Sequence, residues 1–95
     1  MTVHLLLEAE LEILDAVSFY KARAGDLAVN FYDEFKRARE EIAAFPEFWG
    51  SVGGAYRRKL LGRFPYGVIY RVEGDEILIV ALAHTSRRPG YWRGR

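Results

Sequence analysis

The chain has 95 residues, a length that suits one domain spanning residues 1–95, and its 51% hydrophobic content sets it apart from disordered chains. It has no cysteine and only two histidines, far apart, which excludes disulfides, thiolate metal sites and a typical transition-metal site, so we expect no metal and no cofactor. The net charge of +1 is unevenly divided: residues 1–47 hold five basic and ten acidic residues, and residues 48–95 hold nine basic and three acidic ones. This asymmetry indicates a basic face for nucleic acid or an acidic protein segment, the alternative being ordinary solvated charge.

The first apolar run, Val3–Leu7, predicts a short strand buried on both faces. It is far too short for a secretory signal or a membrane span, so we expect a soluble cytoplasmic protein. Glu8–Ala24 predicts a helix stopped by Gly25, with an apolar stripe formed by Ile13, Ala16, Val17, Tyr20 and Ala24. The acids at its start indicate a solvated first turn favoured by the helix macrodipole, rather than a carboxylate site; they are Glu8, Glu10 and Glu12.

A second helix is predicted to begin with Asp26 as its N-cap and to run to about Ala44, shortly before Pro46. Its apolar residues recur at spacings of three or four, as Leu27, Phe31, Phe35, Ala38, Ile42 and Phe45. The very short turn between the helices predicts an αα-hairpin, whose two apolar stripes need a common sheet to bury against.

Three further strands are predicted after a glycine-rich loop, at Tyr56–Leu61, Gly67–Glu73 and Glu76–His84. Gly74-Asp75 separates the last two as the two-residue turn of a β-hairpin. Because side chains alternate along a strand, we expect Arg57 and Lys59 to share one face and Arg58 to take the other. The inferred fold class is α+β, with the order β-α-α-β-β-β: an N-terminal strand, an αα-hairpin and a three-stranded antiparallel β-meander.

Several residues of the second half have two interpretations. His84 ends a buried strand and suits a structural or a functional role. Arg87 and Arg88 are followed by Pro-Gly-Tyr-Trp, which favours a fixed functional surface over a merely solvated pair. Trp49 and Trp92 suit either the core or a partner contact. Tyr66 and Tyr70 alternate with Val68 and Val72, which favours a core face.

The order of elements and three stretches of sequence resemble the RelE/ParE superfamily of bacterial type II toxins. These stretches are Arg57-Arg58, the strand Phe64–Arg71, and the ending His84–Trp92. A weaker similarity lies in the helices, at Ala16–Tyr20, Phe31, Ile42 and Pro46. The resemblance spans almost the whole chain, and its ending favours the ParE-like branch.

This resemblance implies a growth-arresting toxin neutralised by a cognate antitoxin, in a toxin–antitoxin hetero-oligomer where an extended or helical antitoxin segment lies across the sheet and helices. Within the superfamily the ParE-like branch inhibits DNA gyrase, so the first hypothesis is a non-enzymatic gyrase inhibitor. The expected target-binding residues are Arg57, Arg58, Arg63, Arg87, Arg88, Tyr91 and Trp92. We also expect an acidic or apolar antitoxin segment to cover the basic tail.

The alternatives are a RelE-like endoribonuclease that cleaves messenger RNA on the ribosome and a non-toxic relative that has kept antitoxin binding. RNA cleavage needs a base, a cation for the phosphorane charge and a proton donor. For these roles we expect Lys59 or His84 as the base, Arg57, Arg63 and Arg87 on the phosphate, and Tyr91 as proton donor or stacking group. However, Pro89 and Gly90 interrupt the tail where RelE-like nucleases place a dense basic cluster.

Overall fold

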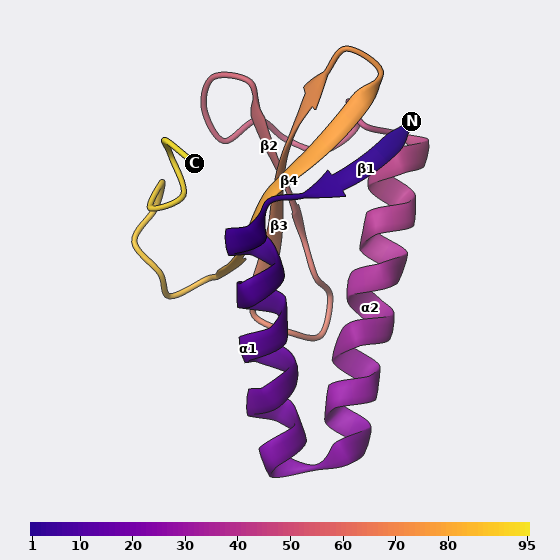
Figure 1. Ribbon diagram of the computed structural model, residues 1–95, viewed down its shortest axis with the longest axis vertical. Coiled ribbons are helices and arrows are strands. Elements are labelled where there is room, and N and C mark those ends of the chain that lie inside the picture. The colour runs from indigo at the N-terminus through magenta and orange to yellow at the C-terminus, as the bar shows by residue number, and fades with distance from the viewer.

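The computed structural model describes residues 1–95 and contains two helices and four strands, which form one sheet (Figure 1). In chain order they are β1 (Thr2–Leu5), α1 (Leu7–Arg23), α2 (Gly25–Ala44), β2 (Tyr56–Leu60), β3 (Tyr66–Glu73) and β4 (Glu76–His84). This is the predicted α+β order, and each element begins and ends within two residues of its predicted bounds. Neither helix combines the length and the apolar composition that crossing a bilayer requires.

The four strands form a single sheet in the order β1-β4-β3-β2. The predicted hairpin of β3 and β4 is confirmed: Glu73 pairs with Glu76, and Gly74 adopts a φ of 63° that suits the first position of a tight hairpin turn. The β2 strand extends this hairpin antiparallel, whereas β1 lies parallel to β4 on the other side. The last strand of the chain is therefore central in the sheet.

The expectation that the first strand is buried on both faces was wrong. β1 is an edge strand that pairs only with β4, and its side chains alternate between exposed Thr2 and His4 and half-buried Val3 and Leu5. The core formed with the helices lies on the face that carries Val3 and Leu5, so Thr2 and His4 on the other face of this edge strand stay exposed.

Side chains of both helices fill the space above one face of the sheet and form the larger core. Phe31, Phe35 and Ile42 of α2 and Ile13 of α1 pack there with strand residues that include Val68, Tyr70, Ile77 and Ile79. Most residues of the predicted stripes are confirmed as part of this core. Ala24 and Leu27, at the turn between the helices, are half-buried outside it, and Phe45 is 65% exposed because it lies past the end of α2.

The N-cap prediction for α2 was also wrong. The cap is Ala24, which has extended backbone and no capping side chain, and Asp26 lies inside the first turn. The Asp26 carboxylate there suits the positive end of the helix macrodipole, without accepting a capping hydrogen bond.

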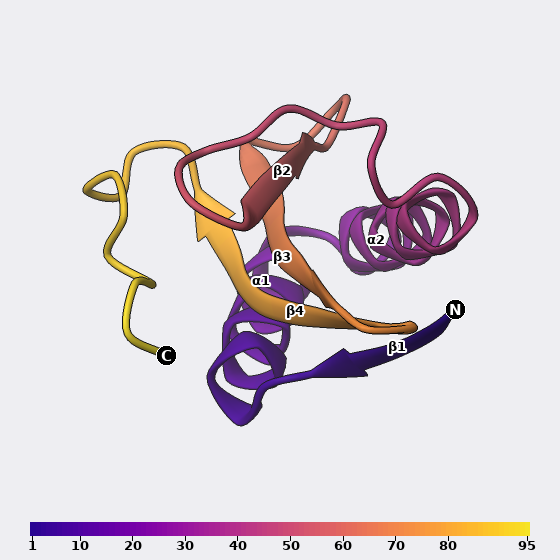
Figure 2. The same cartoon turned by 90° about the horizontal axis from the view of Figure 1, so that it is seen from above.

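A smaller core covers the opposite face, formed by Ile69, Val80, Ala81 and Trp92. It exists because of an irregularity between β3 and β4: Ile69 pairs with Ala81 and Tyr70 with Ile79, which leaves Val80 without a partner on β3. Such a bulge places Val80 and Ala81 on the same face. Residues 85–95, hereafter the tail, fold over this face, and in Figure 2 the tail and α2 lie on opposite sides of the sheet.

Candidate functional site

The three consecutive basic residues of β2 are divided between the two faces of the sheet, as the alternation predicted. Arg57 and Lys59 point to the helix side. Arg57 Nη1 donates to the carbonyl of Trp49 at 2.7 Å, and Lys59 Nζ lies 3.4 Å from a Glu41 carboxylate oxygen and 4.6 Å from the centre of the Trp49 ring. Arg57 thus fastens β2 to its preceding loop, and Lys59 fastens it to α2.

Arg63 lies in the turn between β2 and β3, where it contacts Glu34 of α2. Glu34 is buried, and one of its oxygens accepts the backbone N–H groups of Gly62 and Arg63 while the other lies 3.4 Å from the Arg63 guanidinium. Burial by itself raises the pKa of Glu34, but these donors outweigh it and hold the pKa below the ordinary value. The structure therefore places Arg63 away from the tail, in a contact that fixes a turn.

Most of the other predicted site residues converge on one concavity of about 300 Å³, which we call the tail pocket. It lies where the tail meets the ends of β2, β3 and β4. Its lining includes Arg58, His84, Arg87, Arg88, Tyr91 and Trp92. Of the seven predicted target-binding residues, all but Arg57 and Arg63 meet here.

The tail pocket is strongly basic, since Arg93 also lines it and no aspartate or glutamate does. Arg58, Arg87, Arg88 and Arg93 take part in none of the ion pairs of the chain. Arg93 instead donates to the carbonyl of Val52 at 2.6 Å and stacks over the Trp92 ring. Such guanidinium groups are available for carboxylates or phosphates of a partner.

Two residues that matter for the pocket were missed in the sequence. Arg93 follows Trp92 directly and could have been included in the basic tail by charge alone. Gly67, the second residue of β3, lies beside Arg58, and a Cβ there would lie only 3.0 Å from Arg58 Cγ and Cδ. The glycine makes room for the Arg58 side chain, and nothing in the sequence signals this.

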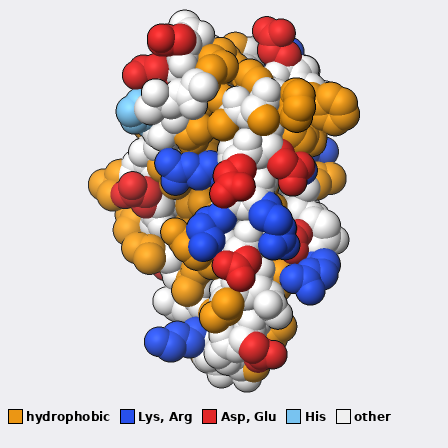
Figure 3. All heavy atoms as spheres, turned by 90° about the vertical axis from the view of Figure 1, so that its right-hand side faces the viewer, with side chains coloured by type: hydrophobic (Ala, Val, Ile, Leu, Met, Phe, Trp, Pro, Cys, Tyr) orange, Lys and Arg blue, Asp and Glu red, His pale blue; other side chains and the backbone are white.

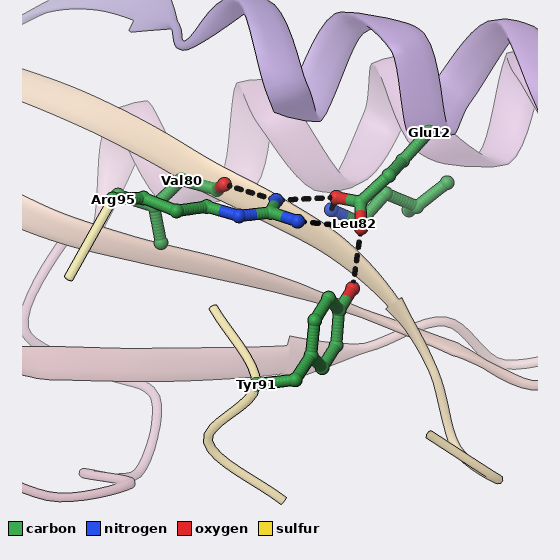
Figure 4. Close-up of polar contacts among 5 residues, drawn as sticks. All are labelled: Glu12, Val80, Leu82, Tyr91 and Arg95. Atoms are coloured by element: carbon green, nitrogen blue, oxygen red, sulfur yellow. Dashed lines mark hydrogen bonds and ion pairs between the residues drawn. The ribbon is translucent and has the colours of Figure 1, made fainter. Parts of the chain in front are cut away.

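The third acid of α1 was misinterpreted as solvated: the Glu12 side chain is only 16% exposed and binds the tail (Figure 4). Tyr91 donates its hydroxyl to Glu12 Oε2 at 2.6 Å, and Arg95 donates Nη1 to Oε1 at 2.8 Å and Nη2 to Oε2 at 3.2 Å. The backbone N–H of Leu82 completes the set at 3.1 Å. Burial and the Glu12 carboxylate both raise the pKa of Tyr91, which keeps its phenol protonated.

The groups named for acid–base chemistry do not share one site. The Lys59 amine lies on the other side of β2 with Glu41 and Arg63. His84 lines the tail pocket, but its Nδ1 accepts the backbone N–H of Ser86 at 3.0 Å and lies 2.7 Å from that residue's hydroxyl. The hydroxyl of Tyr91 is bound to Glu12.

A second surface, apolar rather than basic, lies on the helices. Leu7, Leu11 and Leu14 are 66%, 52% and 59% exposed, and their spacing of four and three places them in one stripe on α1. The stripe borders a groove of about 520 Å³ between α1, α2 and β1. Most of its lining is apolar and includes Val3, Leu5, Tyr32 and Phe35, and the polar residues His4, Glu10 and Arg39 complete it. The spacing of these leucines is visible in the sequence. It was overlooked because the apolar stripe that contains Ile13 already accounted for how this helix packs against the sheet.

The outer side of α2 belongs to neither the tail pocket nor the apolar surface. It faces the viewer in Figure 3, where acidic and basic side chains are mixed along the helix. Lys36, for example, lies 3.5 Å from Asp33 one turn before it. This face is an ordinary solvated one.

Comparison with known proteins agrees with the fold and identifies the family. A solved chain described as the chromosomal ParDE toxin–antitoxin system from P. aeruginosa superposes with a TM-score of 0.80, covering 90% of this chain and 97% of that one at 19% sequence identity. At that identity the likeness shows a shared fold. No curated protein matches the chain significantly. A family model described as "ParE toxin of type II toxin-antitoxin system, parDE" matches residues 3–89. The chain therefore belongs to the ParE toxin family of type II toxin–antitoxin systems.

Proposed function

We propose that this protein arrests growth by binding DNA gyrase through the tail pocket, without itself catalysing a reaction. The observation that carries the proposal is the convergence of Arg58, Arg87, Arg88 and Arg93 on one concavity that contains no acid. A surface of this kind is complementary to acidic side chains or to DNA phosphates, and a complex of gyrase with DNA offers both. The ParE-like branch indicated by the sequence supplies the choice of gyrase.

The same geometry favours binding over ribonuclease chemistry. A base must reach the 2′-hydroxyl while a cation and a proton donor reach the same phosphate, so the groups have to converge. Here Lys59 lies on the far side of β2, and Tyr91 already donates its hydroxyl to Glu12. Loss of Lys59, which lies outside the tail pocket, should therefore leave growth arrest intact.

A ParDE system implies an antitoxin partner, and we place it on the groove between the helices and β1. Exposed leucines in a regular stripe beside a mostly apolar groove fit the apolar face of a helical or extended antitoxin segment. The open edge of β1 lies alongside and offers backbone groups to an extended segment. The expectation from the sequence that an acidic or apolar antitoxin segment also covers the tail stays a prediction.

The proposal is tested with purified gyrase and with growing bacteria. We expect the wild-type chain to inhibit supercoiling and to stop DNA synthesis before protein synthesis. Arg87→Ala/Arg88→Ala should weaken inhibition by about tenfold or more, the range for losing charged contacts in an interface. The control, Lys21→Ala/Lys36→Ala, removes the same charge from the helices and should leave inhibition unchanged. Arrest of protein synthesis first, with intact supercoiling activity, would refute the proposal and favour a ribosomal target.

A further inference from the structure

We propose that Glu12 is a positioning residue for target binding: from α1 it holds the tail in the one arrangement that brings the arginines of the tail pocket together. The inference rests on the proposed function, because it assigns the tail pocket to the target. It extends that function to a residue outside the pocket, on a different element and of the opposite charge.

The contacts of Glu12 make it an anchor rather than a surface ion pair. Both of its carboxylate oxygens are occupied, and the side chains of Glu12 and Arg95 are only 16% and 18% exposed. Charge-assisted bidentate contacts of this kind fix geometry as well as contribute energy, unlike exposed pairs. Two tail residues, Tyr91 and Arg95, are thereby tied to a helix more than 70 positions earlier in the chain.

The position of this anchor is set by the sheet itself. β1 pairs with β4 only as far as Ile79, so the backbone beyond the bulge lacks a strand neighbour on that side. Arg95 Nη1 donates to the carbonyl of Val80 at 3.0 Å, and the N–H of Leu82 donates to Glu12 (Figure 4). Glu12 and Arg95 together take the place of the missing strand, which registers the tail against β4.

A short relay leads from this anchor to the tail pocket. Glu12 fixes the Tyr91 hydroxyl, and the guanidinium of Arg87 lies over the Tyr91 ring, 3.9 Å from its centre. A guanidinium at this distance from an aromatic face is held by a cation–π contact. Holding the ring of Tyr91 therefore also holds Arg87 in the pocket.

The sign of the effect separates positioning from simple electrostatics. Glu12 is an acid close to a basic site, so removing its charge should strengthen the attraction to an acidic or phosphate-bearing target. If Glu12 positions the tail, removing its charge should instead weaken binding, because the arginines lose their common arrangement.

The experiment compares Glu12→Gln and Tyr91→Phe with the wild type and with Glu40→Gln, which removes one exposed acid from α2. Tail order is measured by limited trypsin digestion: the bonds after Arg87 and Arg93 report on the tail, and those after Arg57 and Arg58 report on the sheet. Function is measured as growth arrest at equal expression, which reads the target whatever its identity, and gyrase inhibition is measured separately.

For Glu12→Gln we expect cleavage in the tail and the toxin level required for arrest each to rise about tenfold, the scale of losing hydrogen bonds to a charged group. Cleavage in the sheet should not change. Tyr91→Phe should shift both readouts in the same direction, and Glu40→Gln neither.

Unchanged or stronger arrest by Glu12→Gln, or unchanged cleavage in the tail, would overturn the proposal. Equal increases in tail and sheet cleavage would also overturn it, since they would indicate general unfolding. If the wild type arrests growth without inhibiting gyrase while Glu12→Gln loses arrest, the choice of gyrase fails and the positioning role stands.

Discussion

Replacing Glu34 by alanine should destabilise the protein by about 2–3 kcal/mol at neutral pH. The carboxylate accepts two backbone N–H groups in the turn after β2, each such bond to a charged acceptor being worth about 1.5 kcal/mol at the low end of its range. Removing the carboxylate also removes the cost of burying it, which offsets part of this loss. The ion pair with Arg63 adds little, because that side chain is 64% exposed. For a chain of this size the loss corresponds to a fall in Tm of about 10–20 °C.

The pH dependence supplies the sharper test. The fold lowers the pKa of Glu34, so its stabilisation is fully present above the unfolded-state pKa of about 4.3 and is lost as the pH falls through the lower folded-state value. In urea titrations, the stability gap between wild type and Glu34→Ala should therefore be largest near pH 7 and shrink below pH 4. Glu40→Ala, on the exposed side of α2, is the control. A Glu34→Ala gap no larger than that of the control, or one equal at pH 7 and pH 3, would refute the reasoning.

Three further predictions concern the two surfaces and the core. Gly67→Ala should displace Arg58, whose side chain a Cβ would approach to 3.0 Å, and should weaken gyrase inhibition while costing about 1 kcal/mol of stability in urea titrations. Leu11→Asp should lower affinity for the cognate antitoxin about tenfold or more by calorimetry, with the melting temperature unchanged because the side chain is 52% exposed. Tyr70→Phe should cost about 1–2 kcal/mol in the same titrations, because the buried hydroxyl donates to the carbonyl of Pro46 at 2.6 Å; Tyr32→Phe, on an exposed ring, should cost almost nothing.

Local patterns were sufficient to predict most of the fold. Phe31, Phe35 and Ile42 recur at helical spacing and pack in the larger core, and Gly74 has the positive φ of a hairpin turn. Hydrophobic periodicity and turn residues therefore predict the helices and strands that the structure contains. The parallel neighbour of β4 could not be found in this way. The pairing of Thr2 with Glu76 joins the first strand to the last one, and nothing near either residue specifies it.

The candidate site was predicted in part, for the same reason. Arg87, Arg88 and Tyr91 lie close together in sequence, so their clustering was visible. Glu12 was misassigned because the helix macrodipole already accounts for an acid near the start of α1. Its partners Tyr91 and Arg95 come close to it only when the tail has folded. The position of Arg63 outside the tail pocket could not be predicted locally, since its partner Glu34 lies on a helix nearly thirty residues earlier.

The position of β4 in the sheet bears on how the protein is made. The N-terminal part of a nascent chain leaves the ribosome first, so β1, both helices, β2 and β3 emerge before β4. In the sheet, β4 lies between β1 and β3. Until β4 is available, β1 has no neighbour, and neither face of the sheet can be completed. The nascent chain cannot assemble its native sheet before synthesis passes His84, and the tail pocket forms only after the tail has followed. Synthesis itself thus delays the appearance of the folded protein.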